Sequence, residues 1–239
     1  MWPGGLQKEI MSQLIVPAAE ALRRLRTGNE RFARNVRSID ALASQSRRAS
    51  LAAGQSPFAV ILSCSDSRVP SEIVFDCGLG DLFVVRVAGN VVAPSLLGSI
   101  EFAVSTFGTS LVVVMGHSQC GAVRATLNAL QSSGQPASPN ISDIVSRIVP
   151  GVREVVGAHR DPEELLAAAV RANVRASVAQ VRHGSRILEA QLATGELRVV
   201  GAEYSLEEGR VTFLDDEGDF AAEQRPLSAG AEAPHAAPG

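Results

Sequence analysis

The sequence lacks the features that mark secreted, membrane-spanning and nucleic-acid-binding proteins. Its 239 residues include three cysteines, an odd number that is too small for a disulfide framework. No apolar run approaches the ~20 residues that a membrane span requires, and residues 1–16 lack the continuous apolar stretch of a secretory signal. The formal charge of −3 argues against nucleic acid or an anionic membrane as the main partner. These absences predict a cytoplasmic protein whose thiols are free to bind a metal.

The sequence does contain short strands that alternate with helices along most of its length. Hydrophobic residues make up 46% of the chain, enough for the core of one large domain. The predicted strands are 58–63, 82–87, 111–116 and Leu197–Tyr204, with a hairpin strand at Arg210–Leu214. The predicted helices lie near 70–76, 95–107, 119–131, 140–157, 162–182 and 185–193. This alternation predicts an α/β fold, with a mainly parallel central sheet of about four parallel strands plus an antiparallel edge strand, flanked by helices.

The ends of the chain differ in composition from its middle. We expect a loose lead-in at 1–16, one domain at 17–220 that begins with a helical arm at 17–54, and a disordered tail at 221–239. Pro17 suits the first turn of a helix, where its missing N–H is not needed. Gly28 argues against one unbroken helix in this arm, and a second helix is expected at about 39–53.

Two polar clusters follow predicted strands. Cys64-Ser65-Asp66-Ser67-Arg68 follows the first strand, and His117-Ser118-Gln119-Cys120-Gly121 follows the third. Open α/β sheets bind ligands at the carboxyl ends of their strands. Two thiols and one imidazole suit Zn²⁺, and three protein ligands leave a fourth position for water, as in catalytic zinc sites. Cys120 is also expected at a helix start, where the helix dipole favours thiolate.

The spacing of these ligands does not show that the two strands are neighbours. A single buried cysteine is most often an ordinary core residue, so a structural role remains the alternative for each thiol. Asp66 and Arg68 allow two interpretations as well. They form either a surface ion pair of little energy or a carboxylate held beside the metal. In the second case Asp66 accepts a hydrogen bond from zinc-bound hydroxide, and becomes a fourth zinc ligand only in a closed form without the Arg68 contact.

The segment Gly116–Cys120 also resembles the G-x-S-x-G elbow of serine hydrolases. In that hypothesis Ser118 is the nucleophile, and its partners are Asp161 and His183, which lie further along the chain. The fifth position is Cys rather than Gly, no HGGG-type segment precedes it, and the first polar cluster is left without a function. These departures disfavour a serine hydrolase. Cys77 is expected to be a core or loop thiol.

Several segments together resemble the β-class carbonic anhydrases. Cys64–Pro70 and Gly116–Gly121 are similar to the two zinc motifs of that family, and the resemblance covers roughly residues 17–215. The other matching segments are Leu25–Phe32, Gly80–Asn90 and Gly98–Ala103. The resemblance implies one Zn²⁺ per chain, held by Cys64, His117 and Cys120, and a gating dyad of Asp66 and Arg68. It implies substrate contacts from Gln55, Phe83, Ala88, Phe102 and Gly121, with Gln55 acting across a dimer interface.

Three positions depart from patterns found in this family. Ala88 stands where relatives often have Val, and Phe102 where they often have Tyr, so the shape of the pocket is in question. Some relatives have an inhibitory bicarbonate pocket built from Trp, Arg and Tyr. Arg86 and Tyr204 match two of its positions, but Ile61 stands in the Trp position. We therefore expect no such pocket.

The implied function is the zinc-dependent reversible hydration of CO₂ to bicarbonate and a proton by zinc-bound hydroxide. The implied partners are CO₂ and bicarbonate and a second copy of the chain, in a homodimer or higher homo-oligomer with the active site near the dimer interface. Two alternatives stay open. The same fold could hydrolyse another small cumulene, CS₂ or COS, or the chain could be a structural zinc-binding protein whose site Asp66 closes permanently.

Overall fold

The computed structural model describes residues 15–38, 45–131, 138–157 and 161–214, which form a five-stranded sheet between helices. The strands are β1 (Ala59–Ser63), β2 (Leu82–Arg86), β3 (Leu111–His117), β4 (Arg198–Tyr204) and β5 (Val211–Phe213). Their order is β2-β1-β3-β4-β5. The first four are parallel and β5 is antiparallel to β4. The predicted α/β fold with an antiparallel edge strand is confirmed.

The two central strands that lead to the polar clusters are neighbours. Val60 of β1 pairs with Val112 of β3 in parallel register. Every residue of β1 and of β3 is buried, because helices cover both faces of a parallel sheet and its strands are therefore apolar throughout. The pairing resolves the question that the ligand spacing left open: the carboxyl ends of β1 and β3 meet at one edge of the sheet.

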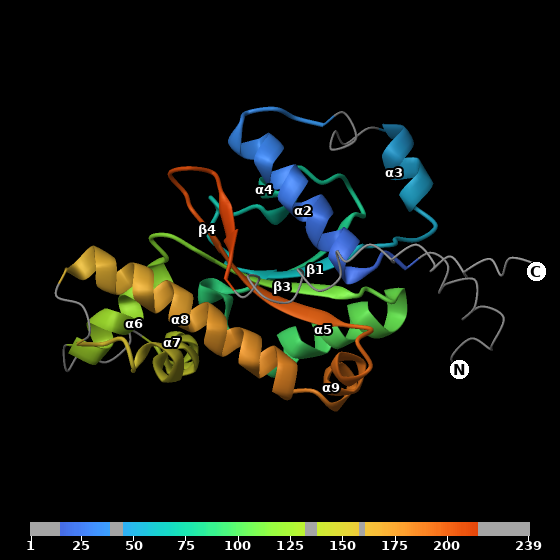
Figure 1. Cartoon of the computed structure of the whole chain (residues 1–239). Helices are drawn as coiled ribbons and strands as arrows, with labels where there is room; N and C mark the ends of the chain where they lie inside the picture. The colour runs from blue at the N-terminus through green and yellow to red at the C-terminus, as the bar shows by residue number, and fades with distance from the viewer. Residues whose placement is uncertain (1–14, 39–44, 132–137, 158–160, 215–239) are drawn as a thin grey trace, which may run out of the picture.

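Helices pack on both faces of the sheet and beyond its carboxyl edge (Figure 1). They are α2 (Ala18–Ala33), α3 (Gln45–Leu51), α4 (Ser71–Val74), the 3₁₀ turn η1 (Ala88–Asn90), α5 (Pro94–Phe107), α6 (Gly121–Gln131), α7 (Pro139–Val152), α8 (Pro162–His183) and α9 (Arg186–Ala193). The helices α2 and α4 share one core with the sheet, and α5, α8 and α9 share a second core on the other face. A third core joins α6, α7 and the start of α8 to Cys64 and Cys120, so the polar clusters lie against a rigid helical layer.

Helix α2 runs unbroken through Gly28, although glycine disfavours the interior of a helix. A Cβ atom at position 28 would lie 1.9 Å from the carbonyl oxygen of Phe75. Glycine therefore allows α2 to approach the end of α4 closely. The packing of the two helices outweighs the unfavourable helix propensity of glycine, about 1 kcal/mol.

The start of α8 is as predicted, whereas several other boundaries differ. Asp161 Oδ1 accepts hydrogen bonds from the backbone N–H groups of Glu163 and Glu164, and Pro162 occupies the first helical position. By contrast, α7 ends at Val152 rather than near 157, and η1 has no counterpart among the predicted elements. None of the helices in the described ranges combines the length and the apolar character needed to cross a membrane.

Some predictions fall on residues that the structure does not describe. The lead-in up to residue 14, the first part of the second arm helix at 39–44 and the tail from 215 onward lie outside the described residues. The boundaries of the domain therefore stay predictions. Within the arm, α3 occupies 45–51, inside the range expected for its second helix.

Candidate active site

Three potential metal ligands converge at the carboxyl edge of the sheet. Cys64 directly follows β1, His117 is the last residue of β3, and Cys120 directly precedes α6. Their ligand atoms all lie within 4.8 Å of one another, and all three residues are buried. The adjacent parallel strands thus bring together the three ligands that the sequence predicted.

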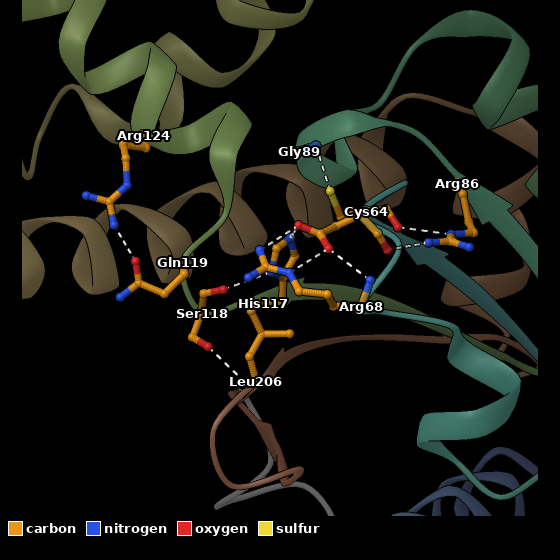
Figure 2. Close-up of polar contacts among 10 residues, drawn as sticks. Cys64, Arg68, Arg86, Gly89, His117, Ser118, Gln119, Arg124 and Leu206 are labelled. Atoms are coloured by element: carbon orange, nitrogen blue, oxygen red, sulfur yellow. Dashed lines mark hydrogen bonds and ion pairs between the residues drawn. The ribbon is translucent and has the colours of Figure 1, made fainter.

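The hydrogen bonds of His117 leave one ring nitrogen directed at this cluster. His117 Nδ1 lies 2.9 Å from the carbonyl oxygen of Ser118, which can only accept, so Nδ1 carries the proton (Figure 2). His117 Nε2 therefore has a free lone pair. It is buried and has no hydrogen-bond partner among the described residues. Buried polar atoms are nearly always satisfied, and a bare imidazole lone pair beside two thiols fits the donor set of a bound metal ion.

The two thiols lie close together, and each shifts the pKa of the other. The pKa of Cys64 is lowered to about 4, chiefly by its hydrogen bond with Cys120, with a smaller contribution from the Gly89 N–H, which lies 3.3 Å from the sulfur. The same bond to Cys64 and burial raise the pKa of Cys120, and they outweigh the helix-start amides of Ala122 and Val123. The amides at the start of α6 thus act in the predicted direction, but the neighbouring thiol outweighs them. A divalent cation at this position would displace the remaining thiol proton and hold both sulfurs as thiolates.

Gly89 can approach the sulfur of Cys64 because it has no side chain. Its φ angle is +70°, and a Cβ atom there would lie 2.8 Å from Cδ1 of Ile148. The carbonyl of Gly89 accepts a hydrogen bond of 2.8 Å from Nδ2 of the buried Asn173 on α8. Asn173 thereby fixes the turn that presents an N–H to the ligand. Asn173 could not be identified from the sequence, because nothing in the surrounding residues indicates this contact.

Asp66 and Arg68 form a tightly held dyad beside the ligands. Arg68 donates from Nε to Asp66 Oδ1 at 2.9 Å, from Nη2 to Oδ2 at 2.8 Å and from its backbone N–H to Oδ1 at 3.0 Å. These bonds hold the pKa of the Asp66 carboxyl far below its usual range. Asp66 Oδ2 lies 3.9 Å from His117 Nε2. Asp66 is thus ionised and held close to the ligand cluster by Arg68, which corresponds to the open arrangement of the dyad.

Arg86, at the end of β2, supports this loop from the neighbouring strand. Its Nε donates to the carbonyl of Cys64 at 3.0 Å, and its Nη2 donates to the carbonyl of Asp66 at 2.6 Å (Figure 2). Tyr204 lies on β4, separated from β2 by β1 and β3, and packs against Phe32 with ring centroids 6.4 Å apart. In this structure Arg86 orients the backbone of the site, a role that the sequence analysis did not assign to it.

The residues expected to contact substrate fall into two groups. Ala88 immediately precedes Gly89, and Gly121 follows Cys120 as the exposed first residue of α6, so both lie beside the ligands. Gln55 is exposed and precedes β1, whereas Cys64 follows this strand, which is about 16 Å long. Phe83 pairs with Val60 near the start of β1, and its ring lies 6.3 Å from that of Phe102. One chain therefore does not bring Gln55, Phe83 and Phe102 to its own ligand cluster.

The geometry excludes the serine hydrolase alternative. The hydroxyl of Ser118 accepts a hydrogen bond from the backbone N–H of Leu206 at 2.9 Å. Its supposed partners flank opposite ends of α8, because Asp161 caps the start of this 22-residue helix and His183 is its last residue. A helix of this length spans about 33 Å, so the two side chains cannot serve one nucleophile.

Fold and site define a class of protein: an α/β protein with a Cys₂His site for a soft divalent cation, next to an ionised carboxylate. The family profile "Carbonic anhydrase" matches residues 59–211. "Carbonic anhydrase 2" of Mycobacterium tuberculosis is 41% identical over 203 residues, which cover 85% of this chain and 96% of the relative. A carbonic anhydrase of Pseudomonas aeruginosa is 36% identical over 70% of this chain and 77% of the relative. The chain belongs to the carbonic anhydrase family.

Solved structures place the fold in the β class of this family. The β-carbonic anhydrase CcaA matches with a TM-score of 0.64 and 28% identity, over 87% of this chain and 88% of the other. A tetrameric β-carbonic anhydrase of Sordaria macrospora matches with a TM-score of 0.62 and 26% identity, over 70% of this chain and 85% of the other. The resemblance noted in the zinc motifs is therefore confirmed across the fold.

Proposed function

We propose that the chain catalyses the reversible hydration of CO₂ to bicarbonate and a proton, with one Zn²⁺ held by Cys64, His117 and Cys120. The observation that carries this proposal is the convergence of two thiols and the free lone pair of His117 Nε2 within 4.8 Å. An ionised carboxylate lies next to this lone pair, with Asp66 Oδ2 at 3.9 Å. Membership of the carbonic anhydrase family agrees with this reaction.

The side chains around the ligands have distinct tasks in this reaction. A zinc ion in this site would lower the pKa of a bound water to about 7 and so supply hydroxide at neutral pH. Asp66 is ionised and can only accept a hydrogen bond, so it selects and orients an attacking water that has a proton to donate. Arg68 holds both carboxylate oxygens and prevents Asp66 from moving onto the metal. The N–H of Gly121, at the start of α6, is available to an oxygen of bicarbonate.

The active enzyme is a homodimer or higher homo-oligomer, with the site near the dimer interface. Gln55, Phe83 and Phe102 contribute to the neighbour's site, as supported by their distance from the ligands of their own chain and by the 54% exposure of Phe102. The related enzyme of Sordaria macrospora is described as tetrameric. The protein acts in the cytoplasm, since its three cysteines are free thiols and two of them must stay reduced to bind a metal.

The direct test is stopped-flow CO₂ hydration with protein of known zinc content, from pH ~6.5 to 9, a range that brackets the pKa of a zinc-bound water. We expect the rate to rise with pH when one zinc is bound per chain. Because the pKa of Asp66 lies far below this range, the inflection reports the attacking water and not the dyad. A fully loaded protein without activity at the alkaline end would contradict the proposal. Assays with CS₂ and COS would then separate another hydrolase from a structural zinc site.

A further inference from the structure

Gln119 occupies a strained position between two of the metal ligands. Its φ angle is +58°, in the left-handed region that residues with a Cβ atom rarely adopt and that is most often filled by glycine, asparagine or aspartate. The chain turns at this residue, and the turn directs both His117 and Cys120 to the ligand cluster. A strained residue persists only where its surroundings hold it, so the contacts of Gln119 bear on the geometry of the site.

The side chain of Gln119 closes a ring with Arg124 and Glu163. Gln119 Nε2 donates to Glu163 Oε2 at 2.6 Å, and Arg124 Nη1 donates to Glu163 Oε1 at 3.2 Å. Arg124 Nη2 completes the ring by donating to Gln119 Oε1 (Figure 2). A carboxamide has both a donor and an acceptor, so it can join a guanidinium to a carboxylate. We call these three side chains the Gln119 ring; it ties the ligand turn to the first turns of α6 and α8.

The opposite side of the turn is held by the sheet. The backbone N–H of Ser118 donates to the carbonyl of Tyr204 at 2.9 Å, and the Ser118 hydroxyl accepts from the N–H of Leu206 at 2.9 Å. The sheet thus fixes the turn next to His117, and the Gln119 ring fixes it next to Cys120. Exposed ion pairs contribute little singly, but a closed network restrains its members more than separate pairs do.

We infer that Gln119, with Arg124 and Glu163, is a positioning residue for the metal site: the ring holds the left-handed turn and so keeps Cys120 and His117 in register for one ion. The inference rests on the proposed zinc site. None of the three ring side chains is a ligand. Loss of the ring therefore should change how tightly and with what geometry the metal is held, while the fold remains.

Variants can break the ring and then rebuild it. Gln119→Ala removes it, and Gln119→Glu sets a second carboxylate against Glu163. The double variant Gln119→Glu/Glu163→Gln exchanges the amide and the carboxylate, so that the ring can close again with the net charge of the original. Glu163→Ala breaks the ring from α8 without replacing any residue of the turn, which provides a test if changes at position 119 prevent folding. Arg23→Ala is the control, because it removes an exposed arginine paired with Glu20 on α2.

Two measurements report on the metal independently of activity. Zinc release to an excess of a chromophoric chelator gives the dissociation rate, and the visible spectrum of the Co²⁺-substituted protein gives the ligand geometry. We expect Gln119→Ala, Gln119→Glu and Glu163→Ala to release zinc about 10-fold faster, in line with lost outer-shell contacts at other metal sites, and to shift the Co²⁺ bands. The zinc release rate and the Co²⁺ spectrum of the double variant should be close to those of the original protein. Arg23→Ala should not differ from the original protein in either measurement.

The inference is overturned if the single variants match the original protein in both measurements, or if the double variant is no better than Gln119→Glu. The original protein serves as the reference for the function itself. If it binds one zinc and hydrates CO₂ while the ring variants behave normally, only the positioning role fails. If it binds no zinc, the proposed function fails as well.

Discussion

Arg68 contacts Asp66 through three hydrogen bonds, yet their importance does not lie in stability. The side chain of Arg68 is 56% exposed and that of Asp66 is 19% exposed, and exposed ion pairs contribute only about 0–1 kcal/mol. What the pair controls is the position of one carboxylate. With Oδ2 at 3.9 Å from His117 Nε2, Asp66 is close enough to become a ligand if it is released. We therefore propose that the dyad decides whether the site is open or closed.

Removal of the guanidinium should close the site without loss of metal. We expect Arg68→Ala to lower kcat by about 100-fold or more, the range for loss of a positioned proton-transfer group, while zinc content stays at one per chain. Arg68→Lys keeps the charge but cannot bind both carboxylate oxygens. Its kcat should therefore lie between those of the original protein and Arg68→Ala. Stopped-flow rates and metal analysis of the same samples provide the test, and a near-normal rate for Arg68→Ala would remove the dyad from the mechanism.

The pH range of this test leaves the dyad ionised. The pKa of Asp66 is lowered in the folded state, chiefly by Arg68, relative to about 3.9 in an unfolded chain. The stabilisation that the pair provides is therefore fully present above pH ~4 and is lost as the pH falls through the lower, folded pKa. Differences between the variants at pH 6.5–9 should thus reflect geometry rather than a changed protonation state.

Cys77 differs from the other cysteines in its surroundings. Burial raises the pKa of its thiol to about 12, with further contributions from nearby carboxylates. The sulfur donates to the carbonyl of Phe75 at 3.4 Å, and the side chain packs against the core under α2. A neutral, half-buried thiol is a poor nucleophile and a poor metal ligand. The structure thus supports the expectation of an ordinary core or loop residue.

At the scale of elements, α2 is fixed to two distant segments by one asparagine. Nδ2 of the buried Asn29 donates to the carbonyls of Val74 and Gly209 at 3.1 and 2.9 Å. Its Oδ1 accepts from the N–H of Val211 at 2.8 Å. A single side chain therefore joins the arm to the end of α4 and to the β4–β5 hairpin.

Loss of this side chain should destabilise the whole domain. Asn29→Ala leaves two carbonyls and one N–H without their partner, so we expect the free energy of unfolding to fall by about 1–3 kcal/mol. Thr27→Ala, at an exposed position of the same helix, should change it by less than about 0.5 kcal/mol. Urea denaturation at equal zinc content measures both, because bound metal stabilises the folded state. Equal stability of the two variants would show that the three contacts contribute nothing.

The sequence best predicts the elements that are determined by their own residues rather than by contacts with distant parts of the chain. β1 and β3 lie within one residue of their predicted bounds because they are continuous apolar runs, and the proposed zinc ligands lie at or just after their carboxyl ends. The unbroken α2 could not be predicted, because the need for Gly28 arises from Phe75, far along the chain. The same holds for Asn173, which contacts Gly89 across 84 residues, and for the Gln119 ring. Contacts of this kind depend on the packed fold and have no local signature.

At the scale of the whole molecule, the residues with proposed functions lie at two edges of the sheet. The proposed metal ligands and the dyad occupy the carboxyl edge, whereas Gln55 and Phe83 lie toward the opposite edge. Phe83, Phe102 and Phe107 form an aromatic cluster with ring centroids 5.7–6.3 Å apart. Phe102 is 54% exposed, and β2 pairs only with β1 within the described sheet. An exposed aromatic cluster next to an edge strand is typical of a surface that another chain covers.

Subunit complementation can show whether Gln55 acts on the neighbouring site. In a symmetric dimer the same surface serves both chains, so each site would combine the Asp66 of one chain with the Gln55 of the other. Asp66→Ala and Gln55→Ala should each be nearly inactive alone. In a hybrid dimer of the two, one site has both native residues, and random mixing should restore about one site in four.

The matched control combines Asp66→Ala with Arg68→Ala. Both changes affect the metal side of a site, so no hybrid of these two contains an intact dyad and mixing should restore nothing. CO₂ hydration measured before and after the two proteins are unfolded together and refolded with zinc distinguishes the cases. If Gln55 served its own chain, hybrids of Asp66→Ala and Gln55→Ala would contain no intact site and would stay inactive. Recovery in that mixture alone would therefore establish that two chains build each active site.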